Sequence, residues 1–148
     1  MELVFDRVNV KRGEVSIRAS GTFSPGVHLV TGRVGAGKST LALLAAGLLS
    51  PDEGSIERRG ISRSMLLFQF PEWHLTGKTV DEETASFGVP AEEVLARAGL
   101  SGRGRDDPFS LSRGEMKKLL LSCLLSRDDD LLVLDEPFGA LDCTGRQW

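Results

Sequence analysis

The first third of the chain alternates between hydrophobic and polar residues in a way that predicts strands and one helix. ELVFDRVNV and EVSIRAS, which flank a basic turn ending in glycine, have the period expected of two antiparallel strands. The short apolar run VHLVTG, residues 27–32, predicts a buried strand. A helix is predicted to begin near Gly37 and to end at Ser50-Pro51, because proline cannot continue it.

The rest of the chain alternates between predicted strands and predicted helices. Three further segments predict strands, a short one between turns and then two buried apolar runs: GSIERRG, MLLFQF (65–70) and LLVLDEP. Two amphipathic segments with acidic first turns predict short helices: TVDEETASFG and PAEEVLARAGL. Ser110 or Ser112 is expected to cap a further helix through GEMKKLLLSCLLS. This alternation predicts an α/β fold with a parallel sheet.

The length of the chain and a change in character after Pro71 bear on its domain organisation. The 148 residues are enough for one domain with a sizeable core. We therefore expect a single domain over 1–148, in which 1–70 and 109–148 form the core. Residues 71–108 are expected to form a small helical insertion.

Composition and charge exclude several classes of protein. The net charge of −3 gives no reason to expect binding through a basic face, so nucleic acid is not expected as a partner. No apolar run approaches the roughly 20 residues of a membrane span, and the N-terminus lacks the layout of a signal peptide. Cys123 and Cys143 lack metal-ligand spacing. We expect a soluble cytoplasmic protein that reaches the membrane only through a partner.

The segment GRVGAGKS, residues 32–39, matches the phosphate-binding pattern G-x-x-x-x-G-K-[ST]. Its glycines allow successive backbone N–H groups to point inward as an anion nest at a helix N-terminus. Lys38 supplies a mobile cation for the β- and γ-phosphates, and Ser39 a hydroxyl for Mg²⁺. The alternative is a glycine-rich turn with a surface lysine. We predict a nucleotide site formed by Gly32, Arg33, Val34, Gly35, Ala36, Gly37, Lys38, Ser39 and Thr40.

Two acids follow the last predicted strand, LLVLDEP. Apolar residues bring Asp135 to the carboxyl edge of the sheet, where ligands bind in open α/β folds. An aspartate at this edge is placed to hold the water shell of Mg²⁺. The next residue, Glu136, is placed to act as general base on an attacking water. The alternative is a solvent-facing acidic pair at the end of a strand.

Three further motifs accompany these two in a fixed order. Gln69 ends a predicted strand in LLFQFPEWHL, LSRGEMKK occupies 111–118, and GALD occupies 139–142. The ordered set resembles the ATP-binding subunits of ABC transporters, with their Walker A, Q-loop, signature, Walker B and D-loop motifs. QFPEWHL and LSRGEMKK look most like the ATPases of energy-coupling-factor importers, which take up vitamins and metal ions such as cobalt or nickel. The resemblance implies a P-loop NTPase fold with N-terminal antiparallel strands.

The resemblance also implies an activity, ATP hydrolysis coupled to transport, and roles for further residues. Gln69 would contact the metal and the attacking water, so that the metal ligands would be Ser39, Gln69 and Asp135. Ser112 and the amide of Gly114 would contact the γ-phosphate of ATP bound to an opposing subunit. Asp142 would couple the two sites.

The implied partners are a second ATPase subunit, identical or paralogous, and an integral membrane transporter subunit. The protein would lie peripherally on the cytoplasmic face of the cell membrane. Trp73 and His74 follow the Q-loop, where the family docks a coupling helix of its membrane subunit. Trp73 either anchors that interface or packs within the helical insertion.

The sequence departs from the family pattern at several positions. It has no tyrosine, so the usual aromatic that stacks on adenine near the N-terminus is absent, and Phe5 suits core packing better. Arg113 replaces the usual glycine of the signature, where it either crowds the neighbouring phosphate or adds charge to it. Both histidines, His28 and His74, precede Asp135, whereas the family's switch histidine lies beyond the D-loop.

The C-terminal segment bears on completeness. In this family the strand after Walker B inserts between the Walker A and Walker B strands, and its loss would leave backbone groups unpaired. We therefore expect a domain that is C-terminally incomplete after the D-loop, with impaired turnover. Three functions follow as hypotheses: a transporter ATPase, complete or truncated; a soluble ABC-type ATPase of DNA maintenance; and a non-catalytic ATP-binding fragment. The short, heptad-free spacing between Gln69 and Ser112 counts against the second.

Overall fold

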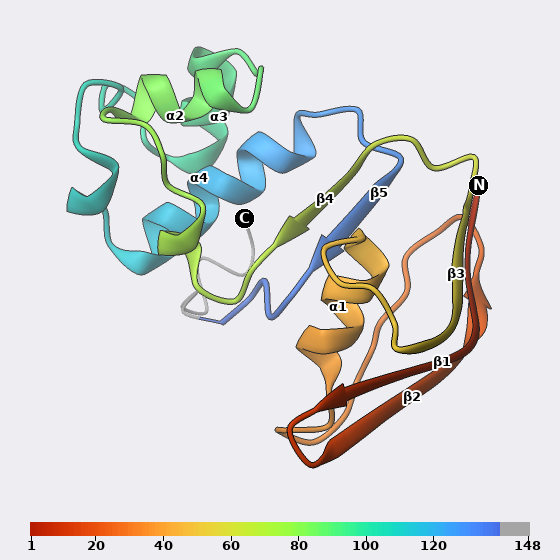
Figure 1. The fold of residues 1–148 in the computed structure, drawn as a ribbon. Helices are drawn as coiled ribbons and strands as arrows, with labels where there is room; N and C mark the ends of the chain where they lie inside the picture. The colour runs from red at the N-terminus through yellow and green to blue at the C-terminus, as the bar shows by residue number, and fades with distance from the viewer. Residues whose placement is uncertain (140–148) are drawn as a thin grey trace. The chain divides into compact units, whose positions relative to one another are not determined.

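The computed structural model describes residues 1–139, and these residues divide into two compact units. The N-terminal unit consists of Met1–Leu66 and Asp129–Asp135. The helical unit consists of Leu67–Asp128 and the described residues from Glu136 onward. Figure 1 shows the elements of both units. The expectation of a single domain with an insertion at 71–108 remains a prediction. Asp142 and Cys143 lie outside the described residues.

The N-terminal unit begins with an antiparallel sheet of three strands. β1 (Glu2–Arg12) forms a hairpin with β2 (Val15–Phe23) and also pairs with β3 (Glu53–Arg59), in the order β2-β1-β3. The hairpin and the short third strand agree with the alternation in the sequence. β2 and β3 follow the period of two that places alternate residues on one face of a sheet.

A β-bulge keeps the apolar residues of β1 on one face. The buried residues of this strand change phase halfway along it: Leu3, Phe5, Val8 and Val10. Strict alternation would place Val8 on the opposite face from Phe5. The pairing register shifts between these two residues, and Arg7 has a φ of 47°. The extra residue restores the phase, so both halves of β1 face the same core.

Gly54 of β3 lies against this bulge, and we predict that Gly54→Ala strongly destabilises the N-terminal unit. Gly54 has a φ of 81°, and an added Cβ would overlap the carbonyl oxygens of Asp6 and Arg7. Because backbone must move, we expect a loss of about 2–4 kcal/mol, measured by urea denaturation. Gly13→Ala is the control, since Gly13 has a φ of 60° but no atom within 4 Å of an added Cβ. Equal costs for the two variants would contradict the steric argument.

Helix α1 (Lys38–Ala46) follows the glycine-rich loop and ends earlier than predicted. Gly47 adopts a φ of 79°, and its amide donates to the carbonyl of Leu44 at 3.2 Å. Glycine after a helix commonly takes this left-handed conformation and terminates the helix. The prediction of an end at Ser50-Pro51 is therefore wrong.

Side chains from the neighbouring strands cap the C-terminus of α1 by donating hydrogen bonds to it. The guanidinium of Arg58, in β3, donates to the carbonyl of Leu44 at 2.6 Å and to that of Ala45 at 3.3 Å. The hydroxyl of Ser64 donates to the carbonyl of Ala46 at 3.3 Å. These bonds satisfy carbonyls that a helix end leaves without intrahelical partners. The end of α1 is thus attached to the antiparallel sheet.

A second sheet consists of β4 (Ser64–Leu67) and β5 (Leu131–Leu134), which run side by side in the same direction (Figure 1). β4 is shorter than the predicted strand at 65–70. The carboxylate of Asp130 accepts the amides of Ser62 and Arg63 at 2.8 and 2.9 Å. These two bonds lower the pKa of Asp130, and the bond from the Arg63 amide has the larger effect. They also join the starts of the two strands. β5 packs against α1.

Residues 27–32 do not form the predicted buried strand. Val27 and Leu29 are 103% and 86% exposed, and the segment has no regular secondary structure. Within residues 1–139 no strand pairs with this segment. A strand needs a neighbour for its backbone N–H and C=O groups, so an apolar sequence alone does not create one.

The helical unit contains short helices around one apolar core. Its elements are η1 (Pro71–Trp73), α2 (Val80–Ser86), α3 (Ala91–Ala98), η2 (Pro108–Ser110) and α4 (Arg113–Leu125). α4 packs against α3 and η1, and α3 also contacts α2. Leu119 and Leu120 of α4 are completely buried, as is Val94 of α3. The two short helices predicted from acidic amphipathic segments are therefore present.

The acidic first turn of α2 does more than face the helix dipole. Glu83 is fully buried, and its carboxylate accepts the amides of Thr76 and Gly77 at 2.8 and 2.7 Å. A buried carboxylate needs such partners. Glu83 therefore fixes the loop that leads into α2, while Thr79 caps the helix by accepting the amide of Glu82 at 3.2 Å.

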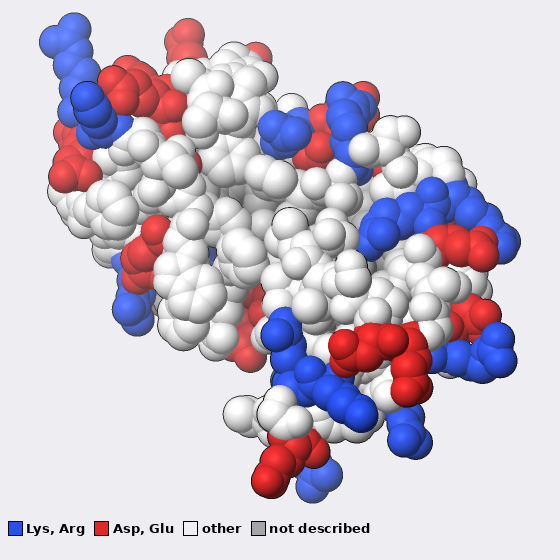
Figure 2. Space-filling model, in the orientation of Figure 1, with Lys and Arg blue, Asp and Glu red and all other residues white. Residues whose placement is uncertain are grey.

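Charges of both signs are distributed over the surface. Figure 2 shows Lys and Arg interspersed with Asp and Glu on the face drawn. Among the described residues, no helix is long and apolar enough to cross a membrane.

Candidate functional site

The loop at residues 32–39 has two glycines in the left-handed conformation and a lysine folded back over it. Gly35 and Gly37 have φ values of 80° and 92°, which other residues rarely adopt. The ammonium of Lys38 lies 3.1 Å from the carbonyl oxygen of Gly32 and 3.2 Å from that of Arg33. Lys38 therefore curls back over its own loop. The charge of the lysine and the N-terminus of α1 thus lie at the same loop.

The first turn of α1 provides donors for an anion. Backbone amides in the first turn of a helix have no intrahelical acceptor, and they carry the positive end of the helix dipole. Lys38 and Ser39 are the first two residues of α1, and the Ser39 side chain is exposed. A phosphate at this position would meet both free amides and the lysine.

Asp135 directly follows β5, the strand that packs against α1 in the N-terminal unit. Leu131 and Val133 of β5 pack on the same core as Leu41 of α1. The carboxylate of Asp135 and the hydroxyl of Ser39 are hard oxygen donors of the kind Mg²⁺ takes beside phosphate and water. The donor types therefore fit the metal. Within residues 1–139, no group of three or more His, Cys, Asp or Glu side chains forms a metal site on its own.

Gln69 and Glu136 contact each other in the helical unit. The Gln69 side-chain amide donates to the Glu136 carboxylate, with 2.9 Å between Nε2 and Oε2. Both side chains are accessible enough to meet a water molecule. The structure thus brings together two residues that the sequence predicted to act on the same water, although they lie far apart in the chain.

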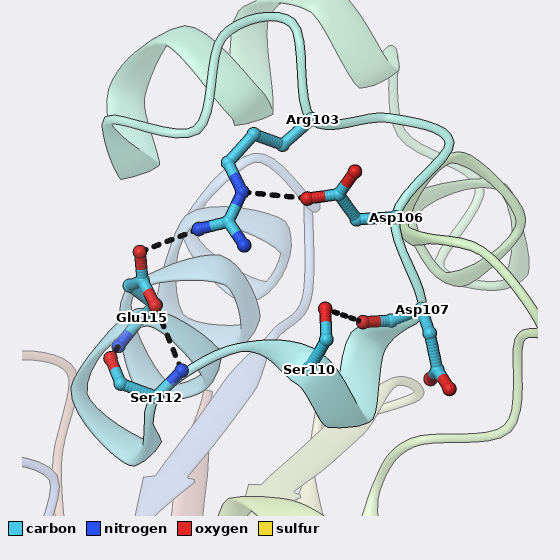
Figure 3. A network of polar contacts seen from close by, with 6 residues as sticks. All are labelled: Arg103, Asp106, Asp107, Ser110, Ser112 and Glu115. Carbon is cyan, nitrogen blue, oxygen red and sulfur yellow. Dashed lines mark hydrogen bonds and ion pairs between the residues drawn. The ribbon is translucent and has the colours of Figure 1, made fainter.

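The start of α4 is built as a helix cap. The Ser112 hydroxyl accepts the amide of Glu115 at 3.3 Å, and the Glu115 carboxylate accepts the amide of Ser112 at 2.8 Å. This reciprocal capping box selects Ser112, not Ser110, as the cap. Arg103 joins it by pairing with Glu115 and Asp106, each at 2.7 Å (Figure 3). The backbone hydrogen bond from Ser112 is the main cause that lowers the pKa of Glu115.

Arg113 turns toward a partner within the helical unit. Its Nε lies 2.7 Å from the Glu72 carboxylate, which belongs to η1. The backbone amide of Glu72 and this guanidinium both lower the pKa of the Glu72 carboxyl. The side chain of Arg113 is still 66% exposed. Both sequence alternatives, crowding and added charge, therefore remain predictions about a closed dimer.

His74 accepts a hydrogen bond that requires its neutral form. The amide of Phe68 donates to Nε2 of His74 at 2.8 Å, so Nδ1 must carry the proton. Burial lowers the pKa of His74, and the carboxylate of Glu83 opposes this shift. Protonation of Nε2 would place two donors face to face beside the segment that leads to Gln69.

We predict that the helical unit loses stability as the pH falls below about 6.5, the ordinary pKa of histidine. The folded-state pKa of His74 is depressed, so its contribution is present above the unfolded pKa and is lost as pH falls through the folded one. Urea midpoints at several pH values measure the effect. His74→Gln, which keeps an acceptor that does not titrate there, should weaken the dependence between pH 7 and 5. His28→Gln is the control, and an unchanged profile in His74→Gln would contradict the assignment.

Aromatic residues flank Gln69 on both sides in the sequence. The rings of Phe70 and Trp73 lie 5.0 Å apart between centroids, and Phe68 contacts Trp73 at 5.9 Å. Trp73 remains 68% exposed. Trp73 therefore contacts other rings of the helical unit but is not buried by them. Its role as an interface anchor stays a prediction.

Phe5 lies where the sequence predicted it, whereas nothing in the sequence indicated the position of Lys117. Phe5 is 3% exposed and contacts Phe23 edge to face, as expected of a core residue. Lys117 was overlooked because a lysine in GEMKK reads as part of the polar face of a helix. It is 1% exposed, and its ammonium contacts the backbone beside Gln69 and Glu136. No signal in the local pattern identifies it.

The comparisons with known proteins agree with these motifs. A family model described as ABC transporter matches residues 18–139. The energy-coupling factor transporter ATP-binding protein EcfA2 of Streptococcus sanguinis is 36% identical over 78% of this chain and 51% of its own length. The aliphatic sulfonates import ATP-binding protein SsuB 2 of Paraburkholderia xenovorans is 42% identical over 78% of this chain and 48% of its own. The chain spans about half the length of the curated relatives it matches.

A solved structure from Pyrococcus furiosus, titled as an ABC transporter ATP-binding protein, has a TM-score of 0.78. It is 18% identical, and the match covers 99% of this chain and 81% of that one. This likeness confirms the predicted fold class, an α/β P-loop NTPase with N-terminal antiparallel strands. A family model that covers most of the chain, with relatives above 30% identity, shows that the chain belongs to the ABC transporter family of ATP-binding proteins.

Proposed function

We propose that this chain binds ATP with Mg²⁺ and contributes to its hydrolysis in a subunit that powers a membrane transporter. The observation that carries the proposal is the loop before α1, where left-handed glycines and the ammonium of Lys38 meet a helix N-terminus. This arrangement suits a polyphosphate better than any neutral ligand. Membership of the ABC transporter family supports the same ligand.

The residues of the loop divide the work of binding. Lys38 exchanges its contacts with the carbonyls of Gly32 and Arg33 for the β- and γ-phosphates, which are stronger acceptors. The free amides at the start of α1 donate to the phosphates. Mg²⁺, when bound, would neutralise developing charge on the phosphates, and Ser39 and Asp135 of the N-terminal unit would hold it or its water shell. The role of Gln69 as a third metal ligand stays a prediction from the family resemblance.

Gln69 and Glu136 are proposed to activate the attacking water. The amide of Gln69 donates to Oε2 of Glu136 at 2.9 Å, which orients the carboxylate and leaves Oε1 to accept a proton. The carbonyl oxygen of Gln69's side chain is then available to accept from the same water. Positioning of this kind accounts for much of the rate in phosphoryl transfer.

The start of α4 is proposed to contact ATP held by a second subunit. The Ser112 oxygen accepts the amide of Glu115, so its hydroxyl hydrogen remains free to donate to a phosphate. The amide of Gly114 belongs to the first turn of α4 and has no intrahelical acceptor. The second subunit is either identical or paralogous, and Asp142 would couple the two sites.

The membrane partner is proposed to be an integral transporter subunit, with this protein on the cytoplasmic face of the cell membrane. Exposed Trp73, beside Phe70, is a suitable anchor for a helix of that partner. QFPEWHL and LSRGEMKK resemble the energy-coupling-factor importers, so we propose import of metal ions or vitamins. The relative named for aliphatic sulfonates import makes sulfonates the competing solute class.

Nucleotide binding and phosphate release test the proposal separately. The chain is titrated with a fluorescent ATP analogue with and without Mg²⁺, and single-turnover phosphate release is then measured. Mg²⁺-dependent binding with release supports the full proposal. Binding without release would leave the non-catalytic nucleotide-binding function, and absence of binding would contradict both.

A further inference from the structure

Lys117 is a buried cation with three acceptors around its ammonium group. It is 1% exposed, although it lies in a helix whose neighbouring lysine is more accessible. Its Nζ donates to the backbone carbonyls of Gln69 at 3.1 Å, Glu136 at 2.7 Å and Gly139 at 3.1 Å. One atom of α4 therefore contacts two segments that are distant in sequence, at Gln69 and at 136–139.

The chemistry of the group explains why it can be buried. An ammonium has three donors and no acceptor, so three carbonyls match its capacity. Burial of an amine in its charged form is unfavourable unless such partners surround it. An arginine would present its donors in a planar fork, and a methionine would present none, although each fills a similar path through the core.

One of the three acceptors belongs to a strained residue. Glu136 has a φ of 51°, a left-handed conformation that residues with a Cβ seldom adopt. The carbonyl that Lys117 contacts is that of Glu136 itself, and it also accepts the amide of Gly139 at 3.1 Å. Strain of this kind persists only where the surroundings enforce it.

We infer that Lys117 is a positioning residue for the pair of Gln69 and Glu136. Its ammonium stabilises the left-handed turn at Glu136 and binds the backbone of Gln69, so the two side chains meet at 2.9 Å. The proposed role uses the contacts of Lys117 to backbone carbonyls, which makes it a positioning residue and not a catalytic one. The inference rests on the proposed function for its catalytic consequence, while the backbone arrangement does not.

The variant Lys117→Met tests this role with two readouts. In the first, NMR-detected amide exchange at Gly139 should be at least about tenfold faster than in the unmodified chain, because the shared acceptor loses its anchor. In the second, turnover should fall at least about tenfold while the dissociation constant for an ATP analogue stays within about twofold. Lys117→Arg should restore part of both effects. Lys78→Met, an exposed lysine in the same unit, is the control and should change neither.

The outcomes separate this inference from the proposed function. Unchanged exchange at Gly139 in a folded Lys117→Met, or weakened nucleotide binding equal to the loss of turnover, would overturn the positioning role. If Lys117→Met does not fold, Lys117→Arg decides by the same readouts, and failure of both to fold would mean a general core residue. If the unmodified chain binds no ATP, the proposed function fails. The exchange measurement would still show whether Lys117 stabilises the turn at 136–139.

Discussion

Lys38→Ala is expected to weaken binding of an ATP analogue at least a hundredfold, or about 2.8 kcal/mol. The ammonium is the mobile cation of the loop, and it already lies within 3.2 Å of the loop carbonyls of Gly32 and Arg33. Without it, the phosphates lose the ammonium that lies at the start of α1 and retain the backbone amides there. Equilibrium titration with a fluorescent ATP analogue in the presence of Mg²⁺ measures the loss.

The control for this experiment is Lys11→Ala, which removes an exposed lysine from β1 of the same unit. It should leave nucleotide affinity unchanged. Circular dichroism of both variants checks that α1 is intact, since the Lys38 side chain also bonds to its own loop. Unaltered affinity in a folded Lys38→Ala would show that residues 32–39 are a glycine-rich turn and not a phosphate site.

Glu136→Gln is expected to reduce phosphate release by a factor of about 10² to 10⁴, the usual contribution of a general base. The amide that replaces the carboxylate has nearly the same shape but cannot accept a proton from water. Because Glu136 is proposed to act in the chemical step only, affinity for ATP should remain. Single-turnover phosphate release at saturating ATP and Mg²⁺ measures the rate, and the analogue titration measures the affinity.

Glu92→Gln gives the matched comparison, because it makes the same change at an exposed position in α3. Its rate should equal that of the unmodified chain. If Glu136→Gln turns over equally fast, the Gln69–Glu136 contact is structural and the general base lies elsewhere. If it also binds ATP poorly, Glu136 contributes to the ground-state complex.

Features that depend on neighbouring residues in the sequence could be predicted. The hairpin of β1 and β2 follows from alternation around a glycine turn. The sequence placed the cap of α4 at Ser110 or Ser112, and the capping box with Glu115 in the structure selects Ser112. The phosphate loop is recognisable because its glycines, lysine and serine must be consecutive. The roles assigned to its residues remain predictions.

Features that depend on distant partners could not be predicted. Residues 27–32 have the composition of a strand, but a strand exists only beside another. Glu83 reads as a surface acid until the amides of Thr76 and Gly77 surround it. Lys117 is likewise buried because its ammonium donates to the carbonyls of residues 69 and 136, which are distant in sequence. Hydrophobic periodicity predicts which face of an element is buried. It does not predict the hydrogen-bond partners of a polar side chain that is buried there.

The attachment of Arg58 to the carbonyls of Leu44 and Ala45 gives α1 a mechanical role. The helix begins directly after residues 32–37 and its end is attached to β3 of the antiparallel sheet, so it would connect a nucleotide bound as proposed to those strands. If phosphates bind at the start of α1 as proposed, the binding free energy would raise the free energy of unfolding of the sheet at its other end. Strands that do not contact ATP would therefore unfold less readily in its presence. The free energy of unfolding of the hairpin would then report how much of the site is occupied.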